Sequence, residues 1–383
     1  MNKSLHSLPA AASPHPGSHL EQVVSLKDGS LKRAPDFISV TRGPGMRSNL
    51  ACGIDTAKGL SVGWQIPLLA IHHMQAHALT PRLVQALKTQ STLSNIKPRF
   101  PFLSLLISGG HSMLIHSKSL VEHKTLATTA DIAIGEALDK IGRLVLPDAT
   151  HAEIKDIAYA KHLSTYAFPT PADYTTYCPP STRGAECVRS NNQFGWSIPT
   201  PFVDTRQLSF SFSGIASEVH RLFAIRSTNP DFAESERQTF ARTALTVSFN
   251  HLASRTVIAL EKLHQEQQQP IKTLVVSGGV AANTYLRHVL RQFLDVRDFG
   301  GVELSFPPVE LCTDNAAMVA WCGMEMFEEG WRSELSCRAV RRWSMDSEVS
   351  EGEGEEGRGG ILGVEGWHNI NEVGKRHTAG QPI

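Results

Sequence analysis

Short apolar runs that end at turn residues alternate with segments of helical character along this chain. Four runs have the length and apolar content of β-strands, at residues 35–41, 67–71, 102–107 and 271–279. Helical character is found in the segments at residues 72–87, 239–264 and 281–294. Repeated strand, turn and helix units predict an α/β fold, in which ligands gather at strand ends beside glycine loops and helix N-termini.

The clearest helical periodicity lies in residues 132–146. Its apolar stripe has members three or four residues apart, namely Ile134, Leu138, Ile141 and Val145. Asp139 lies off that stripe and is therefore free for a polar role. A last helix, rich in Ala and Met, is predicted to begin at Thr313 or Asp314, either of which can cap it.

Two glycine turns share one form. The strand at 102–107 runs into Ser108-Gly-Gly-His111 and then into the alternating residues 112–117, which predicts a β-hairpin. Ser277-Gly-Gly-Val280 also follows an apolar strand. Glycine lets backbone N–H groups approach a phosphate closely, although an ordinary tight turn is the alternative for each copy.

His73 and His77 stand four residues apart, a spacing that on a helix puts both imidazoles on one face, within reach of a single metal ion. Surface or capping histidines are the alternative. Met74 follows the first of the two, so the glutamate base of a zinc peptidase helix is missing. Asp314 could add an anionic oxygen ligand or act as the N-cap.

Polar residues beside the glycine turns are further candidates. Asp139 and Asn283 could hydrogen-bond a ribose or a base, or could simply be solvated on their helices. His111 could contact a ligand or merely finish the hairpin. Phe210 and Phe212 in the motif SFSFSG favour packing rather than chemistry.

Length, charge and cysteine content limit the classes of protein to which this chain can belong. A chain of 383 residues predicts two lobes with a cleft. Its 37 basic and 37 acidic residues balance, so no overall charge indicates a nucleic-acid partner. Six cysteines without a CxxC pair favour a reducing compartment, and no apolar run of about eighteen residues predicts a membrane span.

Taken together, seven ordered blocks resemble the universal tRNA threonylcarbamoyladenosine transferase family, whose members also carry an older peptidase description. The blocks are VTRGPGMRSNLACGIDTAKGL, HHMQAH, LLISGGHSMLI, IGEALDKIGRLV, SFSFSGI, VVSGGVAANTYLR and CTDNAAMVAWCG. They span residues 35–345 apart from an insertion, and the forms GEALDK and FSFSG resemble the bacterial and mitochondrial branch.

The resemblance implies an actin-like, or sugar-kinase-like, two-lobe α/β fold with a ligand cleft between the lobes. It implies one divalent metal ion per subunit, iron or zinc, on His73, His77 and Asp314. The residues implied to hold or adjoin the nucleotide part of the substrate are Leu106, Ile107, Ser108, Gly109, Gly110, His111, Asp139 and Asn283. The metal would orient and polarise the carbamoyl group.

The implied activity is transfer of the threonylcarbamoyl group from threonylcarbamoyl-AMP to N6 of the adenosine next to the anticodon, in tRNAs reading codons that begin with A. No residue is assigned as general base. The resemblance further implies a homodimer without a membrane partner. Mitochondrial placement is expected, with the cytoplasm as the alternative.

The resemblance also suggests a division of the chain. Residues 35–98, joined by a C-terminal helix at 313–345, would form the first lobe, and residues 99–312 the second lobe, with an irregular insertion at about 165–200. Residues 1–34 and the Glu- and Gly-rich residues 346–383 are predicted to be disordered.

Two features depart from the family pattern. The family's opening blocks, one like ETSCDD and one like GGVxPExAxRxH, are not found before Pro35. The explanations are an incorrect gene start, which we favour, a truncated form without activity, or a partner that supplies the missing strands by β-augmentation. The glycine-rich turn expected after IGEALDK is replaced by PDATHAEIKD. The competing functions are therefore a metallopeptidase and a non-catalytic, truncated family member.

Overall fold

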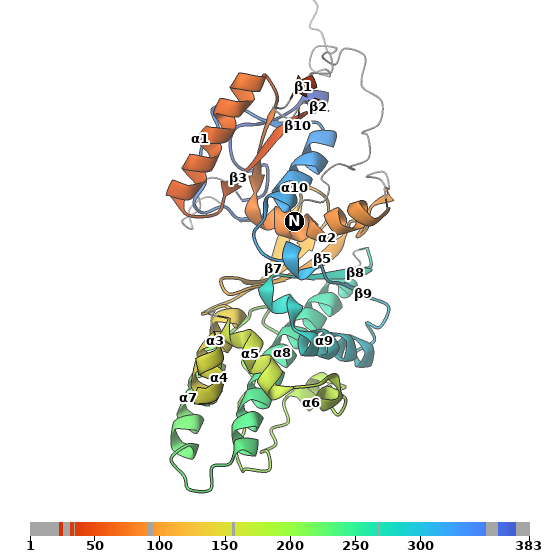
Figure 1. Cartoon of the computed structure of the whole chain (residues 1–383). Helices are drawn as coiled ribbons and strands as arrows, with labels where there is room; N and C mark the ends of the chain where they lie inside the picture. The colour runs from red at the N-terminus through yellow and green to blue at the C-terminus, as the bar shows by residue number, and fades with distance from the viewer. Residues whose placement is uncertain are drawn as a thin grey trace, which may run out of the picture. The chain divides into compact units, whose positions relative to one another are not determined.

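The computed structural model (Figure 1) describes residues 23–25, 31–33, 35–89, 95–154, 158–266, 269–349 and 359–372. The chain divides into two compact units. Unit 1 comprises Met1–Arg99, Leu120–Glu122 and Asp314–Ile383, and unit 2 comprises Phe100–Ser119 and His123–Thr313. Each unit has its own sheet and its own helices, which confirms the predicted α/β class.

The sheet of unit 1 has the strand order β11-β10-β4-β3. β3 (Ile38–Gly43) and β4 (Leu68–His72) are parallel, as a strand, helix, strand unit requires. β10 (Trp331–Ser333) lies antiparallel to β4, and β11 (Trp367–Asn369) pairs antiparallel with β10. The C-terminal part of the chain therefore supplies half of this sheet.

Helices α1 (Arg47–Trp64) and α10 (Ala316–Glu328) cover opposite faces of this sheet (Figure 1). Successive strand residues point to alternate faces. Val40 packs in a buried cluster with α1, whereas Phe37 stacks on Phe327 of α10 with ring centroids 5.0 Å apart. Unit 1 is thus a layered α/β/α structure.

Helix α2 (His73–Thr89) begins at the residue directly after β4, and it confirms the helix predicted at residues 72–87. Most of its residues are buried, because α2 packs along α10 as well as against β4. Its first residue, His73, is therefore fixed at the carboxyl end of a central strand.

Unit 2 has a five-stranded sheet with the order β7-β6-β5-β8-β9. Its strands are β5 (Phe102–Ile107), β6 (Ser112–Ser117), β7 (His123–Thr128), β8 (Thr273–Ser277) and β9 (Glu303–Ser305). β5 and β6 are antiparallel from Phe102↔Ser117 to Ile107↔Ser112, so the predicted hairpin is confirmed. β5, β8 and β9 are parallel.

Helices pack on this sheet around one large apolar core. They are α3 (Ile134–Val145), α5 (Tyr159–Ala167), α7 (Ser213–Arg226), α8 (Glu234–Gln265) and α9 (Thr284–Val296), whereas none of the described side chains of the short α4 (Asp148–Glu153) belongs to this core. The predicted stripe of α3 is buried in that core, and so are Phe210 and Phe212, which confirms their packing role.

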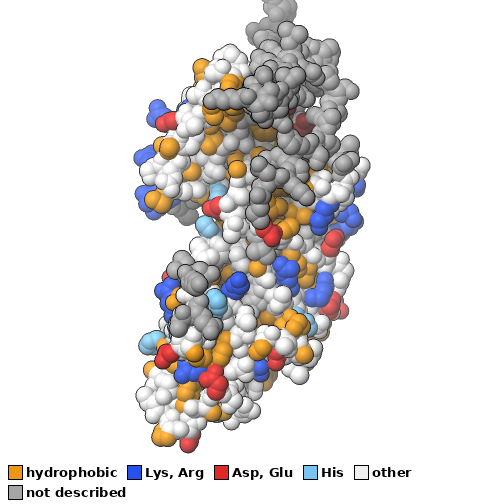
Figure 2. All heavy atoms as spheres, in the orientation of Figure 1, with side chains coloured by type: hydrophobic (Ala, Val, Ile, Leu, Met, Phe, Trp, Pro, Cys, Tyr) orange, Lys and Arg blue, Asp and Glu red, His pale blue; other side chains and the backbone are white. Residues whose placement is uncertain are grey.

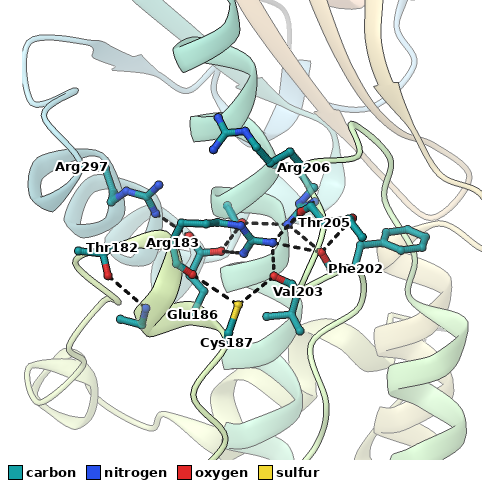
Figure 3. Close-up of polar contacts among 12 residues, drawn as sticks. Thr182, Arg183, Glu186, Cys187, Phe202, Val203, Thr205, Arg206 and Arg297 are labelled. Carbon is teal, nitrogen blue, oxygen red and sulfur yellow. Dashed lines mark hydrogen bonds and ion pairs between the residues drawn. The ribbon is translucent and has the colours of Figure 1, made fainter.

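The predicted insertion at 165–200 is largely irregular, but a buried acid anchors it. Its ordered pieces are the end of α5, a 3-10 turn (Pro171–Tyr174) and α6 (Arg183–Glu186). Arg183 points at the backbone carbonyl groups of Phe202 and Val203 (Figure 3).

The acid that anchors the insertion is Glu186, whose side chain is only 6% exposed. It pairs with Arg183 of its own helix and, at 2.5 Å, with Arg297 at the end of α9. It also accepts a hydrogen bond from the Ser254 hydroxyl of α8 at 2.5 Å. One carboxylate therefore joins the insertion to two core helices.

Two predictions about the last helix are wrong. The helix predicted over 313–345 ends at Glu328, because Gly330 turns the chain with a positive φ of 89° into β10. Neither Thr313 nor Asp314 caps it. The N-cap is Asn315, whose side-chain oxygen accepts a hydrogen bond from the Met318 N–H at 2.9 Å.

The predicted disordered ends also differ from the structure. Residues 359–372 contain β11 and contribute Val364 to a buried cluster with Val340 and Trp343, against which Trp367 packs, since two tryptophans and two valines offer enough apolar surface to pack. Near the start, β1 (Val23–Ser25) pairs antiparallel with β2 (Leu31–Arg33). The rest of residues 1–34, and residues 350–358 and 373–383, lie outside the described residues.

The described surface shows no dominant sign of charge on the face drawn in Figure 2, where basic and acidic side chains are interspersed. This agrees with the balance of 37 basic and 37 acidic residues. Of the helices that the structure describes, none combines the length and the hydropathy needed to cross a bilayer.

Asp131 fastens the motif SFSFSG to the segment that leads into α3. Its carboxylate accepts hydrogen bonds from the hydroxyl groups of Ser211 and Ser213, both at 2.6 Å, and from the N–H groups of Phe212 and Ile132. Burial alone would raise the pKa of Asp131, but these four hydrogen bonds outweigh it and lower the pKa to about 2.

We expect Asp131→Asn to destabilise the protein in a pH-dependent way. A carboxylate whose pKa is lowered from 3.8 to about 2 on folding contributes stability above its unfolded pKa and loses it as the pH falls through the folded pKa. Since Asp131 is largely exposed, the contribution is about 1 kcal/mol. Urea unfolding of both proteins should show the difference at about pH 6 and a smaller one at about pH 3; an equal difference at both would contradict this.

We expect Glu186→Gln to lower the free energy of unfolding by about 3 kcal/mol, because it removes the carboxylate that pairs with Arg183 and leaves the buried Arg297 with Glu261 alone as counter-charge. Urea denaturation measures this change. Glu218→Gln is the control, since Glu218 pairs with the exposed Arg221 of the same helix, α7, and it should change little. Equal effects of the two substitutions would contradict the role given to Glu186.

Candidate functional site

Unit 1 brings the two predicted metal-binding histidines and Asp314 together. The carboxylate oxygen Oδ1 of Asp314 lies 3.2 Å from Nε2 of His73 and 3.0 Å from Nε2 of His77. The ligand atoms of the three residues all lie within 4.8 Å of one another. We call these residues the His–His–Asp cluster.

This cluster fits a divalent metal ion. Bonds of about 2.0–2.2 Å to nitrogen and oxygen place two ligands of a tetrahedral ion about 3.3 Å apart, close to the separations between Asp314 and the imidazoles. Two imidazoles and one carboxylate are a donor set suited to zinc or ferrous iron, and three protein ligands leave positions open. The described residues contain no other group of three such ligand atoms as close together.

The three side chains come from rigid neighbouring elements. His73 and His77 occupy the first two turns of α2 and are mostly buried, with side chains 19% and 11% exposed. Asp314 precedes the N-cap of α10, and its side chain is 76% exposed. The cluster therefore combines two fixed imidazoles with a carboxylate open to solvent.

In unit 2, the first glycine turn, Ser108–His111, closes on itself. The Ser108 hydroxyl accepts hydrogen bonds from the N–H groups of Gly110 and His111, at 3.2 and 3.0 Å. The Ser108 N–H donates to the His111 carbonyl at 2.8 Å. A Cβ added to Gly109 or Gly110 would meet no atom within 4 Å, so the outer side of this turn is open.

The second glycine turn, Ser277–Val280, lies beside the first. Leu106 is opposite Ser277 in the parallel β5–β8 pair, so both turns leave the same edge of the sheet. Gly278 has a φ of +100°, and a Cβ there would lie 2.2 Å from the Ile107 carbonyl oxygen. Only glycine permits this approach of the two backbones.

Leu106 and Ile107 contribute to this edge through their backbones. Both side chains are buried, at 3% and 0% exposure, in the sheet. The N-terminus of α3 adjoins them, since the Gly135 N–H donates to the Ser108 carbonyl at 3.2 Å. Two glycine turns and a helix N-terminus therefore meet here, the arrangement that suits an anionic nucleotide.

Asp139 and Asn283 both bind α5, so simple solvation on their helices does not describe them. The Asp139 carboxylate accepts a hydrogen bond from the Ala160 N–H at 2.7 Å. Asn283 caps α9 by accepting from the Leu286 N–H at 3.1 Å, and its amide donates to the Ser164 hydroxyl at 3.0 Å. α5 thus links the two predicted ligand residues.

The structure therefore sorts the predicted site residues into two groups. The His–His–Asp cluster belongs to unit 1, and the glycine turns, Asp139 and Asn283 belong to unit 2. α4 (Asp148–Glu153) stands where the family pattern expects a glycine-rich turn.

Sequence reasoning missed the residues that hold the cluster in place. His72, the last residue of β4, lies with Nε2 3.0 Å from the Trp343 carbonyl and accepts from the Met74 N–H. Arg82 of α2 pairs with Glu325 of α10. These partners are more than 240 residues apart in sequence, so no local pattern indicates them.

Comparisons with known proteins agree with the block pattern. A family model described as tRNA N6-adenosine threonylcarbamoyltransferase matches residues 18–321, a span that begins before Pro35. The mitochondrial protein of that name from Schizosaccharomyces pombe is 37% identical over 342 residues, which cover 87% of this chain and 69% of the relative. The protein of that name from Cereibacter sphaeroides is 32% identical over 81% of this chain and 74% of its own length.

Among solved structures, a crystal structure of T. kodakarensis HypF aligns with a TM-score of 0.41 and 12% identity, over 77% of this chain and 41% of that one. A score this low does not establish a shared fold. The family match covers most of the chain, and relatives above 30% identity extend over more than two thirds of their own lengths. The chain therefore belongs to the tRNA N6-adenosine threonylcarbamoyltransferase family.

Proposed function

We propose that this protein transfers a threonylcarbamoyl group from threonylcarbamoyl-AMP to N6 of the adenosine next to the anticodon, in tRNAs reading codons that begin with A. The observation that carries this proposal is the closed His–His–Asp cluster in a chain whose family is named for the reaction. The paired glycine turns of unit 2 support it, because they leave the same edge of the sheet and the outer sides of Gly109 and Gly110 are open to an adenylate.

The metal would be held by His73, His77 and Asp314. Bound there, a divalent ion supplies Lewis-acid polarisation of a carbonyl oxygen and orients the group that carries it. α2 and α10 hold the ligands in advance, so little rearrangement is needed when the ion binds.

The adenylate would be held by unit 2, through the backbone of residues 106–110 and the polar side chains beside it. The open outer sides of Gly109 and Gly110 leave room for a phosphate or ribose to approach the main chain. Asp139 and Asn283 fix α5 against this edge, which places their polar side chains beside the proposed ligand. His111 lies at the end of the same turn.

The reaction forms one N–C bond and breaks one C–O bond. The adenosine amine attacks the carbamoyl carbon, AMP leaves with the bonding electrons, and the amine loses a proton to solvent. We assign no residue as general base, so the chain contributes mainly by positioning the two substrates.

The peptidase alternative is not favoured. The relatives are named as transferases. Met74 follows the first histidine of the cluster and cannot serve as the base that activates water in a zinc peptidase. A non-catalytic role would require that the cluster and the glycine turns be retained without use.

Two further properties are proposed. The named location of the Schizosaccharomyces pombe relative supports placement in the mitochondrion. A second copy of the chain is the proposed protein partner, because Leu60 and Trp64 are four residues apart on α1 and leave an apolar face 40% and 48% exposed.

We expect His77→Ala to lower formation of the modified nucleoside at least about tenfold, because loss of a metal ligand costs more than loss of its supporting contacts. The measurement is mass spectrometry of the nucleoside after incubation with threonylcarbamoyl-AMP and unmodified tRNA. His368→Ala is the control, since His368 is exposed on β11 of the same unit. Equal activity of the parent and the His77 variant would contradict the assignment, and inactivity of the parent would contradict the function.

Light scattering tests the proposed dimer. We expect the mass of two chains for the parent and of one chain for Trp64→Glu, because the new charge on α1 would lose its hydration in the interface. Ile225→Glu is the matched control, as Ile225 is an apolar residue of α7 exposed to 58%. A parent of single mass, or equal dissociation by both substitutions, would argue against this dimer face.

A further inference from the structure

A buried ion pair joins the helix that carries the two histidines to the helix that follows Asp314. The Arg82 guanidinium of α2 donates from Nε to both carboxylate oxygens of Glu325 on α10, at 2.8 and 3.0 Å. The two side chains are 8% and 5% exposed. The pair is therefore shielded from water, and its two hydrogen bonds fix how the guanidinium lies against the carboxylate.

The same guanidinium also holds the chain that leaves α2 for unit 2. Nη1 of Arg82 donates to the carbonyl oxygens of Ile96, at 3.3 Å, and Pro98, at 2.7 Å. These residues belong to the last segment of unit 1 before Phe100, where unit 2 begins. Arg82 therefore links α2 both to α10 and to the segment at Ile96 and Pro98.

Glu325 is oriented from its own helix as well. The Trp321 indole N–H, one turn earlier in α10, donates to the same carboxylate at 2.5 Å. Burial raises the pKa of Glu325, and the hydrogen bonds from Arg82 and Trp321 oppose that rise. The cost of removing both charges from water thus offsets much of their attraction. Such a pair adds little to stability, but it favours one placement of the two helices over others.

Helix α2 needs an external restraint near its metal ligands. Pro81 lies inside the helix and has no N–H to donate to the carbonyl four residues earlier, which is that of His77. The turn that carries His77 therefore lacks one of its own helical hydrogen bonds. Arg82 is the next residue, so the ion pair acts directly beside the proline.

We propose that Arg82 and Glu325 are positioning residues for the His–His–Asp cluster: they set the register of α2 against α10 and thereby the distance between the imidazoles and the Asp314 carboxylate. This inference rests on the proposed metal site. Gln75, between the two histidines, makes a second polar link to α10, with its amide 3.7 Å from the Met326 sulfur.

A purely structural role is the competing explanation, and unit 2 provides a matched pair that tests it. Arg226 donates from Nε to Glu236 at 2.8 Å, and Glu236, which is 0% exposed, also accepts from the Trp196 indole at 2.9 Å. The matched pair has the same three residue types and similar distances. It lies outside the unit that holds the cluster.

The experiment measures Co²⁺ affinity and the Co²⁺ absorption spectrum of the full-length protein, together with the thermal midpoint without metal. The variants are Arg82→Lys and Glu325→Gln, and the matched controls are Arg226→Lys and Glu236→Gln. Lysine keeps the charge but cannot reach the carboxylate and two carbonyl groups together. We expect both sets to lower the thermal midpoint, and only the first to weaken Co²⁺ binding about tenfold with a changed spectrum.

Each outcome supports or overturns the positioning role or the metal site. Co²⁺ affinity equal to that of the parent in the Arg82 and Glu325 variants would overturn the positioning role, and so would equal weakening by the matched controls. If Arg82→Lys fails to fold, Glu325→Gln, which keeps the size of the side chain, serves the same comparison. Failure of the parent to bind Co²⁺ would overturn the metal site itself, and this result is distinct from the others.

Discussion

Parallel pairing at the centre of each sheet is the constraint on which the rest of this structure depends. Parallel strands need a crossover between them, so their carboxyl ends meet at one edge and helices begin there. β4 is followed at once by His73, and β5 and β8 are followed by Ser108 and by Gly278. The two histidines of unit 1 and the two glycine turns of unit 2 are thus placed by the same backbone rule.

Each unit also buries charged side chains. Unit 1 buries Arg82 and Glu325, and unit 2 buries Glu186 among arginines. These groups are paired with several partners each, which is the condition under which buried charge is tolerated. Their partners come from distant parts of the chain, so they join elements that sequence order keeps apart.

This distribution explains which features the sequence could predict. The hairpin after residue 102, the helix of His73 and the apolar stripe of α3 follow from local periodicity, and the structure confirms them. The predicted N-cap of α10 was wrong because Thr313, Asp314 and Asn315 have similar capping preferences. The prediction of a disordered tail was wrong for residues 359–372, because Val364 and Trp367 are too few to change the composition of a Glu- and Gly-rich segment, yet they complete a local core with Val340 and Trp343. The Arg82–Glu325 pair has no local signature at all.

The contribution of β10 and β11 to unit 1 bears on how the chain is made. β10 and β11 come from residues 331–333 and 367–369, and α10 also follows unit 2 in the chain. A ribosome delivers residues in order, and domains fold as they emerge. Unit 2 is contiguous apart from residues 120–122 and can fold while synthesis continues. The part of unit 1 that precedes unit 2, in contrast, must wait until residues 331–369 have been made to gain its last strands, and during that interval the edge of β4 is open to chaperones or to misdirected pairing.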